Sequence, residues 1–194
     1  MKFFLRLGLI LLAFCAIATA LLAFVNSITQ PRIELLKAEQ ERQARASLLP
    51  GVEFERVAQN VPGADSLIYY IGRAADTKEI KGYTFTAAKV GYSSTVKTMA
   101  AVDSEFKLLA IKVIEQAETP GLGANATAPT FTDQFKGLAP DQILVDKDGG
   151  QIKSLTGATI TSRAIANSLT EQITAVRLDA EQRLTAPGNE EVTP

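Results

Sequence analysis

Residues 7–25 form a run of about 19 positions that are apolar or small throughout and carry no charge. A helix of this length spans roughly 29 Å at about 1.5 Å per residue, close to the roughly 30 Å hydrocarbon core of a bilayer. The run therefore predicts one membrane-spanning helix near the N-terminus. Lys2 and Arg6 precede it, and the positive-inside rule places such charges in the cytoplasm. The body of the chain is then expected outside the cytoplasm.

A cleaved signal peptide is the alternative interpretation of the same run. Residues 18–20 (Ala-Thr-Ala) resemble a small-x-small cleavage site. Apolar residues continue beyond it at Leu21, Leu22, Phe24 and Val25, so no polar mature sequence follows the site. This continuation favours an uncleaved anchor. We assign residues 1–29 to a cytoplasmic N-terminus and a transmembrane segment.

A second helix is predicted after the anchor. Gln30 and Pro31 would open it, because proline is favoured in the first turn of a helix, and residues 50–51 (Pro-Gly) would end it. Its middle, residues 37–45, is rich in charge and glutamine, which is typical of a solvated face; contact with a neighbouring membrane subunit is a second interpretation. Residues 30–51 are therefore expected to be a helix that leads into the next domain.

The pattern changes to strands at residue 52. Residues 67–73, 82–90, 95–102 and 106–115 are β-rich runs joined by short turns, which predicts a mainly antiparallel sheet. A short helix with aromatic anchors is expected at 130–137, a short strand at 141–145 and a turn at 148–150. The predicted fold class is α+β, with a domain over residues 52–185 and a disordered acidic tail over 186–194.

Serine and threonine are concentrated in residues 154–162, directly before a helical pattern with apolar residues four apart at 165, 169 and 173. Thr161 or Ser162 is predicted to cap this helix, and Gly157 permits a tight or positive-φ turn before it. Thr159 is thus expected beside the positive end of a helix, which favours a phosphate group. Taken alone, such a stretch more often serves only as a cap.

Composition excludes several kinds of site. The chain has no histidine and one cysteine, Cys15, which lies inside the apolar run. A zinc site, a haem with histidine ligation, an iron–sulfur cluster and a histidine-based triad are therefore excluded within this chain. The net charge of −1 gives no electrostatic footprint for nucleic acid. Redox chemistry would need an organic cofactor.

Three segments together resemble one family. Residues 156–162 (Thr-Gly-Ala-Thr-Ile-Thr-Ser), preceded by Asp-Gly-Gly at 148–150, resemble the flavinylation motif of the FMN-binding domain in RnfG and NqrC. Residues 91–94 (Gly-Tyr-Ser-Ser) resemble that family's Gly-Tyr-Ser/Gly-Gly turn, with Ser94 replacing the last glycine, and residues 118–123 match its Glu-Thr-Pro-Gly-Leu-Gly loop. The compact length is closer to RnfG than to the generally longer NqrC.

The resemblance implies a cofactor site. In the family, the threonine that ends the Ser/Thr-Gly-Ala-Thr tetrad carries FMN through a phosphoester, and here that residue is Thr159. The loop at 118–123 would approach the isoalloxazine ring, with Leu122 packed on the ring and Glu118 or Thr119 bonded to its polar edge. No catalytic or metal residue is implied. The implied cofactor-binding residues are Thr159, Thr156, Gly157, Ala158, Thr161, Ser162, Glu118, Thr119, Gly121, Leu122, Gly123, Tyr92 and Ser93.

The resemblance also implies a function. The chain would be a flavoprotein subunit in the bacterial inner membrane, with its domain on the periplasmic side. It would relay electrons in an Rnf-type complex that couples ferredoxin and NAD to ion transport, with iron–sulfur and flavin subunits as partners and a flavin transferase for maturation. The family often has Asp, read by that transferase, where Lys153 stands. A cofactor-free extracytoplasmic interaction domain is the alternative, and a stand-alone FMN-domain protein is a third possibility.

Overall fold

The computed structural model of the protein describes residues 2–59 and 66–185. The chain separates into two compact units, Met1–Arg42 and Gln43–Pro194. The first unit is helical, and the second contains a five-stranded sheet with the helices that pack on it. The tail over 186–194, for which the sequence predicts disorder, lies outside the described residues.

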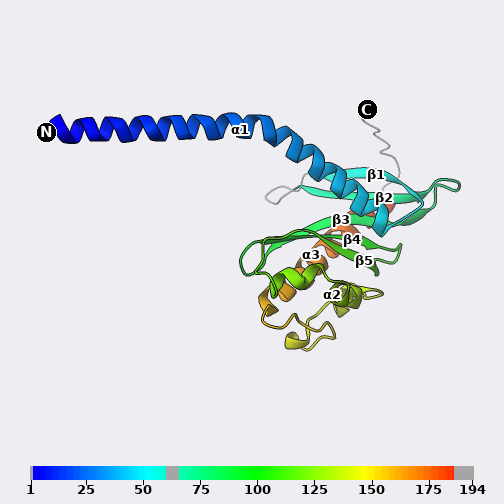
Figure 1. Ribbon diagram of the computed structural model, residues 1–194. Helices are drawn as coiled ribbons and strands as arrows, with labels where there is room; N and C mark the ends of the chain where they lie inside the picture. Colours follow the sequence, from blue (N-terminus) through cyan, green and yellow to red (C-terminus); the bar gives the residue numbers. More distant parts are fainter. Residues whose placement is uncertain (1, 60–65, 186–194) are drawn as a thin grey trace. The chain divides into compact units, whose positions relative to one another are not determined.

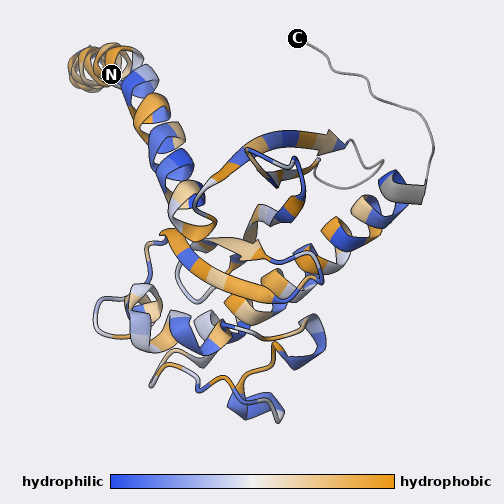
Figure 2. Ribbon diagram, turned by 90° about the vertical axis from the view of Figure 1, so that its right-hand side faces the viewer, coloured by the Kyte–Doolittle hydropathy of each residue, from blue (hydrophilic) through white to orange (hydrophobic). Residues whose placement is uncertain are grey.

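One helix, α1 (Lys2–Leu48), contains both the apolar run and the charged stretch after it. It is long and apolar enough to cross a membrane. Figure 2 shows hydrophobic residues along its N-terminal part and many hydrophilic residues along its C-terminal part. The prediction that a separate helix opens at Gln30 and Pro31 is wrong, because the helix continues through Pro31. A proline removes one backbone donor and crowds one carbonyl, which an otherwise continuous helix can absorb locally.

The sheet is an antiparallel meander in chain order, as the sequence predicts. Tyr69 pairs with Phe85, and Phe85 pairs with Ala100, so side chains of three adjacent strands share one face. The α+β fold class is confirmed. The strands are β1 (Val52–Gln59), β2 (Leu67–Ala74), β3 (Ile80–Val90), β4 (Thr95–Val102) and β5 (Leu108–Glu115).

A long helix, α3 (Thr159–Thr185), covers this face of the sheet (Figure 1). Its apolar residues recur at the spacing that the sequence predicts, and Ile165, Leu169 and Ile173 are at most 1% exposed. They form one hydrophobic cluster with Tyr69 and Phe85 of the sheet. At about 25 cal/mol per Å² of apolar area, each such side chain contributes on the order of 1.5–3 kcal/mol by leaving water. The cluster therefore fixes α3, including its first turn, against the strands.

The last turn of α1 belongs to the second unit and packs on the other face of the sheet. The guanidinium of Arg45 lies 3.3 Å from the centroid of the Tyr70 ring, a cation–π contact. Leu49 lies over Gly72, where an added Cβ would come within 2.5 Å of its Cδ2 atom. Residues 43–49 are thus attached to the strands by specific contacts.

Short helical turns connect β5 to α3. They are η1 (Gly123–Thr127), α2 (Pro129–Thr132), η2 (Asp133–Phe135), η3 (Pro140–Gln142) and η4 (Asp146–Asp148). The helix predicted at 130–137 is confirmed as α2 with η2, and its aromatic anchors Phe131 and Phe135 are buried edge-to-face with centroids 5.3 Å apart. The turn predicted at 148–150 is present, with Gly149 at a φ of 85°.

The strand predicted at 141–145 is wrong. Pro140 opens the turn η3, and the side chain of Gln142 accepts a 3.0 Å hydrogen bond from the N–H of Ala139, which stabilises that turn. Val145 makes only an isolated bridge to Ile152. The alternating apolar residues Ile143 and Val145 are buried in the core without a partner strand, so the alternation was misleading here.

Candidate functional site

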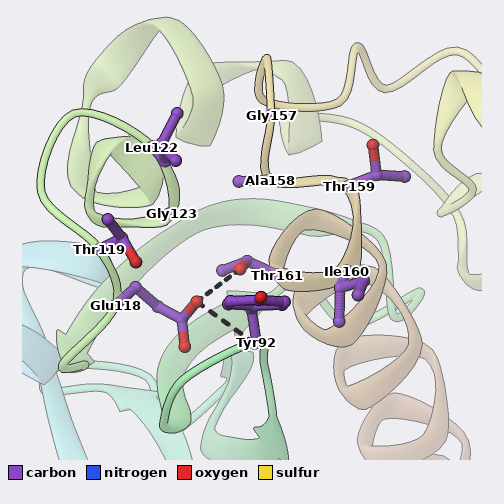
Figure 3. A pocket seen from close by; sticks show the side chains of 10 residues that line it. All are labelled: Tyr92, Glu118, Thr119, Leu122, Gly123, Gly157, Ala158, Thr159, Ile160 and Thr161. Carbon is purple, nitrogen blue, oxygen red and sulfur yellow. Dashed lines mark hydrogen bonds between the residues drawn. The ribbon is translucent and has the colours of Figure 1, made fainter.

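A pocket of about 440 Å³ lies where three segments of the chain meet. These are the turn after β3, the loop after β5 and the first turn of α3 with the residues before it. Figure 3 shows its side chains converging from these segments. The lining residues are Tyr92, Glu118, Thr119, Leu122, Gly123, Gly157, Ala158, Thr159, Ile160 and Thr161.

The residues before α3 form the tight turn that the sequence predicts. Gly157 has a φ of 73°, a conformation that glycine adopts without strain. A Cβ at this position would also lie 3.0 Å from Cδ2 of Leu122. The glycine therefore lets the 118–123 loop approach the start of α3 closely.

Helix α3 begins at Thr159, two to three residues earlier than the predicted cap. Capping by Thr161 or Ser162 is thus wrong, and both residues are fully buried inside the first turn. Their hydroxyls have other partners. Ser162 donates to the carbonyl of Ala158 and accepts from the N–H of Leu155, while Thr161 donates to Glu118.

The N-terminus of α3 is a favourable place for an anion. The first main-chain bond into the helix runs from Ser162 N–H to Ala158 O, at 3.0 Å. The N–H groups of residues 159–161 precede it and have no acceptor within the helix. Together with the helix dipole, they favour negative charge at this end. The prediction that Thr159 lies beside the positive end of a helix is confirmed.

Glu118 is a buried carboxylate in the wall of the pocket, 6% exposed. Its Oε1 atom accepts from the N–H groups of Ser93 and Ser94 and from the Ser94 hydroxyl, at 2.9–3.0 Å. Its Oε2 atom accepts from Tyr92 N–H at 3.2 Å and from the Thr161 hydroxyl at 2.7 Å. Glu118 therefore joins all three segments that form the pocket.

These hydrogen bonds determine the charge of Glu118. Burial by itself raises the pKa of this carboxyl, but the hydrogen bonds from Thr161, Ser94 and Ser93 outweigh it and lower the pKa to about 2. The side chain is therefore ionised at neutral pH. The oxygens of Glu118 already accept hydrogen bonds from five protein donors, so the side chain has a structural role in holding the pocket together. The hydrogen bond from Glu118 to the edge of a flavin ring, which the resemblance implies, remains a prediction.

Two motif glycines make room for this carboxylate. A Cβ at Gly91 would lie 2.8 Å from Oε1 of Glu118, and a Cβ at Gly123 would lie 2.8 Å from Oε2. Real Cβ atoms essentially never approach so closely. The glycines of the Gly-Tyr-Ser-Ser turn and of the Pro-Gly-Leu-Gly loop are thus explained, at these positions, by the buried Glu118.

Large apolar side chains at the pocket are exposed. Tyr92 is 72% exposed, Ile160 is 51% exposed and Leu122 is 42% exposed. Sequence reasoning missed Ile160. The sequence did contain an indication of its role. Ile160 is apolar, but it does not fall at the four-residue spacing of the buried residues Ile165, Leu169 and Ile173, so it is expected on another face of the helix.

Some implied site residues do not line the pocket. Thr156 is exposed on the turn, and Gly121 has a φ of 78° with open space beside it. Ser93 contributes its main-chain N–H to Glu118, and Ser162 closes the turn before α3. These four lie next to the pocket, whereas the other implied residues line it.

Charged groups surround the start of α3. Arg163, four residues after Thr159, makes a bidentate ion pair with Asp148 at 2.6 and 2.7 Å. Asp146 accepts from the N–H and hydroxyl of Ser154. Lys153 has an exposed side chain, and its main-chain N–H donates to Oε1 of Gln134 at 2.7 Å.

The donor set fits a phosphorylated aromatic cofactor. A hydroxyl at the first residue of a helix, with free main-chain donors beside it, suits a phosphate. Exposed Tyr92, Leu122 and Ile160 offer apolar surface to a planar ring, and the volume lies in the range of small-molecule sites. Among the described residues no group of three or more His, Cys, Asp or Glu side chains could hold a metal ion.

Two family models match parts of the chain, and one of them agrees with this chemistry. Residues 91–174 match the family described as "FMN-binding domain", and residues 1–52 match "RnfG N-terminal region". The second match includes the apolar part of α1, which supports a membrane-anchored protein. The solved structure of Shewanella oneidensis NqrC aligns with 68% of this chain and 74% of the NqrC chain, with 17% sequence identity and a TM-score of 0.46.

Two relatives cover most of the chain. The G subunit of the ion-translocating oxidoreductase complex of Methanosarcina acetivorans is 35% identical over 79% of this chain and 84% of its own length. The G subunit of the Na(+)-translocating ferredoxin:NAD(+) oxidoreductase complex of Acetobacterium woodii is 33% identical over 87% of this chain and 89% of its own length. On these matches, the chain belongs to the RnfG family, whose members are subunits of ion-translocating oxidoreductase complexes.

Proposed function

We propose that this chain is a membrane-anchored flavoprotein subunit that carries covalent FMN and relays electrons within an Rnf-type ferredoxin:NAD oxidoreductase complex. One observation carries the proposal: the hydroxyl-bearing Thr159 is the first residue of α3 and lines the pocket, within a segment that matches the FMN-binding domain. FMN supplies redox chemistry that the side chains of this pocket do not. The chain's own residues bind, orient and tune it.

Thr159 is the proposed attachment residue, through a phosphoester at its hydroxyl. The N–H groups at the start of α3 would stabilise the phosphate charge by about 0.3–1 kcal/mol. Arg163 lies one turn further along the same helical face, because residues four apart on a helix are neighbours. A covalent bond would also keep the flavin on a domain outside the cytoplasm, where little free FMN is available.

The pocket's apolar side chains have a second role in this proposal. Tyr92, Leu122 and Ile160 would exclude water from part of the ring and hold its orientation. Glu118 would hold these surfaces at fixed positions, because its hydrogen bonds reach the turn that carries Tyr92 and the helix that carries Ile160. No side chain is assigned to acid–base catalysis.

The location and partners are proposed from the anchor and the family. Lys2 and Arg6 before the apolar part of α1 favour a cytoplasmic N-terminus in the bacterial inner membrane, with the domain on the periplasmic side. The names of the relatives support membership of a complex with other subunits. Iron–sulfur and flavin subunits would exchange electrons with this chain, and a flavin transferase would load it.

A cofactor-free interaction domain is the second candidate. Two observations favour it: Lys153 stands where the family often has Asp, and Glu118 explains Gly91 and Gly123 without a cofactor. A flavin domain that acts outside a complex is a further possibility.

The test is to produce the full chain together with a matched flavin transferase. Denatured protein is viewed on a gel under ultraviolet light, and its intact mass is measured. We expect fluorescence that survives denaturation and an added mass of FMN less one water. Thr159→Ala should lose both, whereas the matched control Thr174→Ala, an exposed threonine further along α3 and outside the motif, should keep them. An unmodified wild-type mass would favour the cofactor-free candidate, and flavin retained by Thr159→Ala would place the bond elsewhere.

A further inference from the structure

We propose that Glu118 provides a fixed negative charge in the wall of the pocket and thereby lowers the reduction potential of the flavin bound there. The proposal rests on the proposed function, since it concerns the same pocket. Glu118 is the one charged side chain among the ten residues that line it. Figure 3 shows its carboxylate turned toward Thr161 and the Tyr92 turn, with hydrogen bonds to both.

Among the residues that the structure describes, no cation belongs to the hydrogen-bond network of Glu118. All five donors are neutral: three main-chain N–H groups and the hydroxyls of Ser94 and Thr161. Three cations on the neighbouring elements form ion pairs with other carboxylates, and Lys112 of β5 and Lys153 are not among the residues that line the pocket. The ion pairs are Lys89 with Glu171, Lys97 with Glu115, and Arg163 with Asp148. The pocket therefore retains one net negative charge from Glu118.

The position of this charge is fixed. Gly91 and Gly123 each approach the carboxylate so closely that an added Cβ would lie 2.8 Å from one of its oxygens. The Thr161 hydroxyl holds the Oε2 atom by a 2.7 Å hydrogen bond. Glu118 is 6% exposed, so water screens its field weakly compared with a surface charge. The side chain cannot turn into solvent without breaking five hydrogen bonds.

A fixed negative charge acts on redox equilibrium through Coulomb repulsion. Reduction places an additional electron on the flavin, and this is less favourable beside a carboxylate than beside a neutral group. Charges near a bound cofactor are a principal means by which a protein tunes its electronics. Removing the charge while keeping the shape should therefore make reduction easier.

Glu118→Gln removes the charge with small structural change. The amide oxygen can occupy the Oε1 position and keep the donors of Ser93 and Ser94. The amide NH₂ then faces Thr161, whose hydroxyl can rotate to accept, since a hydroxyl both donates and accepts. Only the longest contact, 3.2 Å from Tyr92 N–H, loses its acceptor. Thr161→Val is the matched control, because it breaks the same network and keeps the carboxylate.

The experiment uses the full chain in detergent, with covalent flavin verified by intact mass. Absorbance is followed during a redox titration at pH 7 in wild type and both variants. We expect a higher midpoint potential in Glu118→Gln, with about a tenfold higher ratio of reduced to oxidised flavin at a fixed solution potential. Thr161→Val should show a midpoint potential below that of wild type, because its carboxylate has lost a donor and its negative charge is less compensated.

An unchanged or lower potential in Glu118→Gln would overturn the proposal. An equal rise in both variants would also overturn it, since a loosened pocket would explain both. If Glu118→Gln does not retain flavin, the midpoint potential of Thr161→Val becomes the test. A potential below that of wild type supports the charge effect, and a potential at or above that of wild type overturns it. A wild-type chain without covalent flavin would refute the proposed function itself, which is a different result from a loaded chain that is insensitive to Glu118.

Discussion

The hydroxyl of Thr161 donates a 2.7 Å hydrogen bond to Oε2 of Glu118, across 43 residues of sequence. Through the other oxygen, the same carboxylate accepts from the turn that carries Ser93 and Ser94. One side chain thus sets the relative positions of three segments that the sequence can only present as separate motifs.

We expect Glu118→Ala to lower the free energy of unfolding by at least about 2 kcal/mol. The substitution leaves the part-buried N–H groups of Ser93 and Ser94 without their acceptor, and an unsatisfied group that water cannot reach costs about 1–3 kcal/mol. Thr161→Val removes one hydrogen bond and should cost only about 1 kcal/mol. Denaturant unfolding followed by circular dichroism compares the two variants. Equal losses would show that the main-chain donors find other partners.

Stability should fall in acid because of the same group. The pKa of Glu118 is about 2 in the folded chain, against an ordinary value of 4.5. The unfolded chain therefore takes up this proton first as pH falls. The stabilisation is complete above about pH 4.5 and is lost as pH approaches 2, by up to roughly 3 kcal/mol.

The measurement for this pH effect is unfolding of wild type and Glu118→Gln between pH 7 and pH 3. Other carboxyls, such as those of Asp146 and Asp148, also have lowered pKa values, so their protonation in acid lowers the stability of both proteins. The stability difference between the two proteins isolates Glu118. It should be largest at neutral pH and shrink in acid, and a difference that is constant with pH would rule out the assigned pKa.

A double-mutant cycle tests why Gly91 is a glycine. In the wild-type background, Gly91→Ala places a Cβ 2.8 Å from Oε1 of Glu118, and we expect a loss of about 1–3 kcal/mol. In a Glu118→Ala background the remaining close contact is Val96 at 3.2 Å, so the loss should fall by at least half. The difference is a coupling energy, which contacting residues typically show. If the stability losses of the two single variants simply add in the double variant, a contact other than the one with Glu118 requires glycine at position 91.

Local patterns were sufficient to predict four of the five strands, whereas β1 (Val52–Gln59) was not among the runs that the sequence pattern picked out. Residues 82–90 and 95–102 alternate and are bounded by short turns, and these runs became β3 and β4 with nearly the expected bounds. The spacing of Ile165, Leu169 and Ile173 likewise predicted the buried face of α3. In each case the signal lies within one element, and burial on one face is enough to explain it.

Features that depend on distant partners could not be predicted. Thr161 is a good capping residue by type, but its hydroxyl bonds to Glu118 from another element, so the helix starts earlier. From the sequence alone, Glu118 is indistinguishable from an ordinary solvated loop carboxylate. Its buried role follows only from the folded structure, in which Tyr92 and Thr161 contact it. Pro31 is equally ambiguous, because a proline can open a helix or lie inside one. Only tertiary structure distinguishes these alternatives.

Lys153→Asp should increase flavin loading without changing the fold. Its side chain is exposed, and the main chain at this position is held by the Gln134 side chain through N–H and carbonyl contacts, so the substitution should alter stability by less than about 0.5 kcal/mol. By the family resemblance, an Asp here is what the transferase reads, so we expect severalfold faster loading when the transferase is limiting. Intact mass against time measures it.

The control for this prediction is Lys147→Asp, which makes the same charge change at an exposed position in η4. An equal acceleration in both variants would show that the transferase responds to net charge near the start of α3, not to position 153. No acceleration in Lys153→Asp would mean that the acidic side chain is dispensable in this chain. Asp148 would then be the next residue to test, since its ion pair with Arg163 already holds a carboxylate beside the first turns of α3.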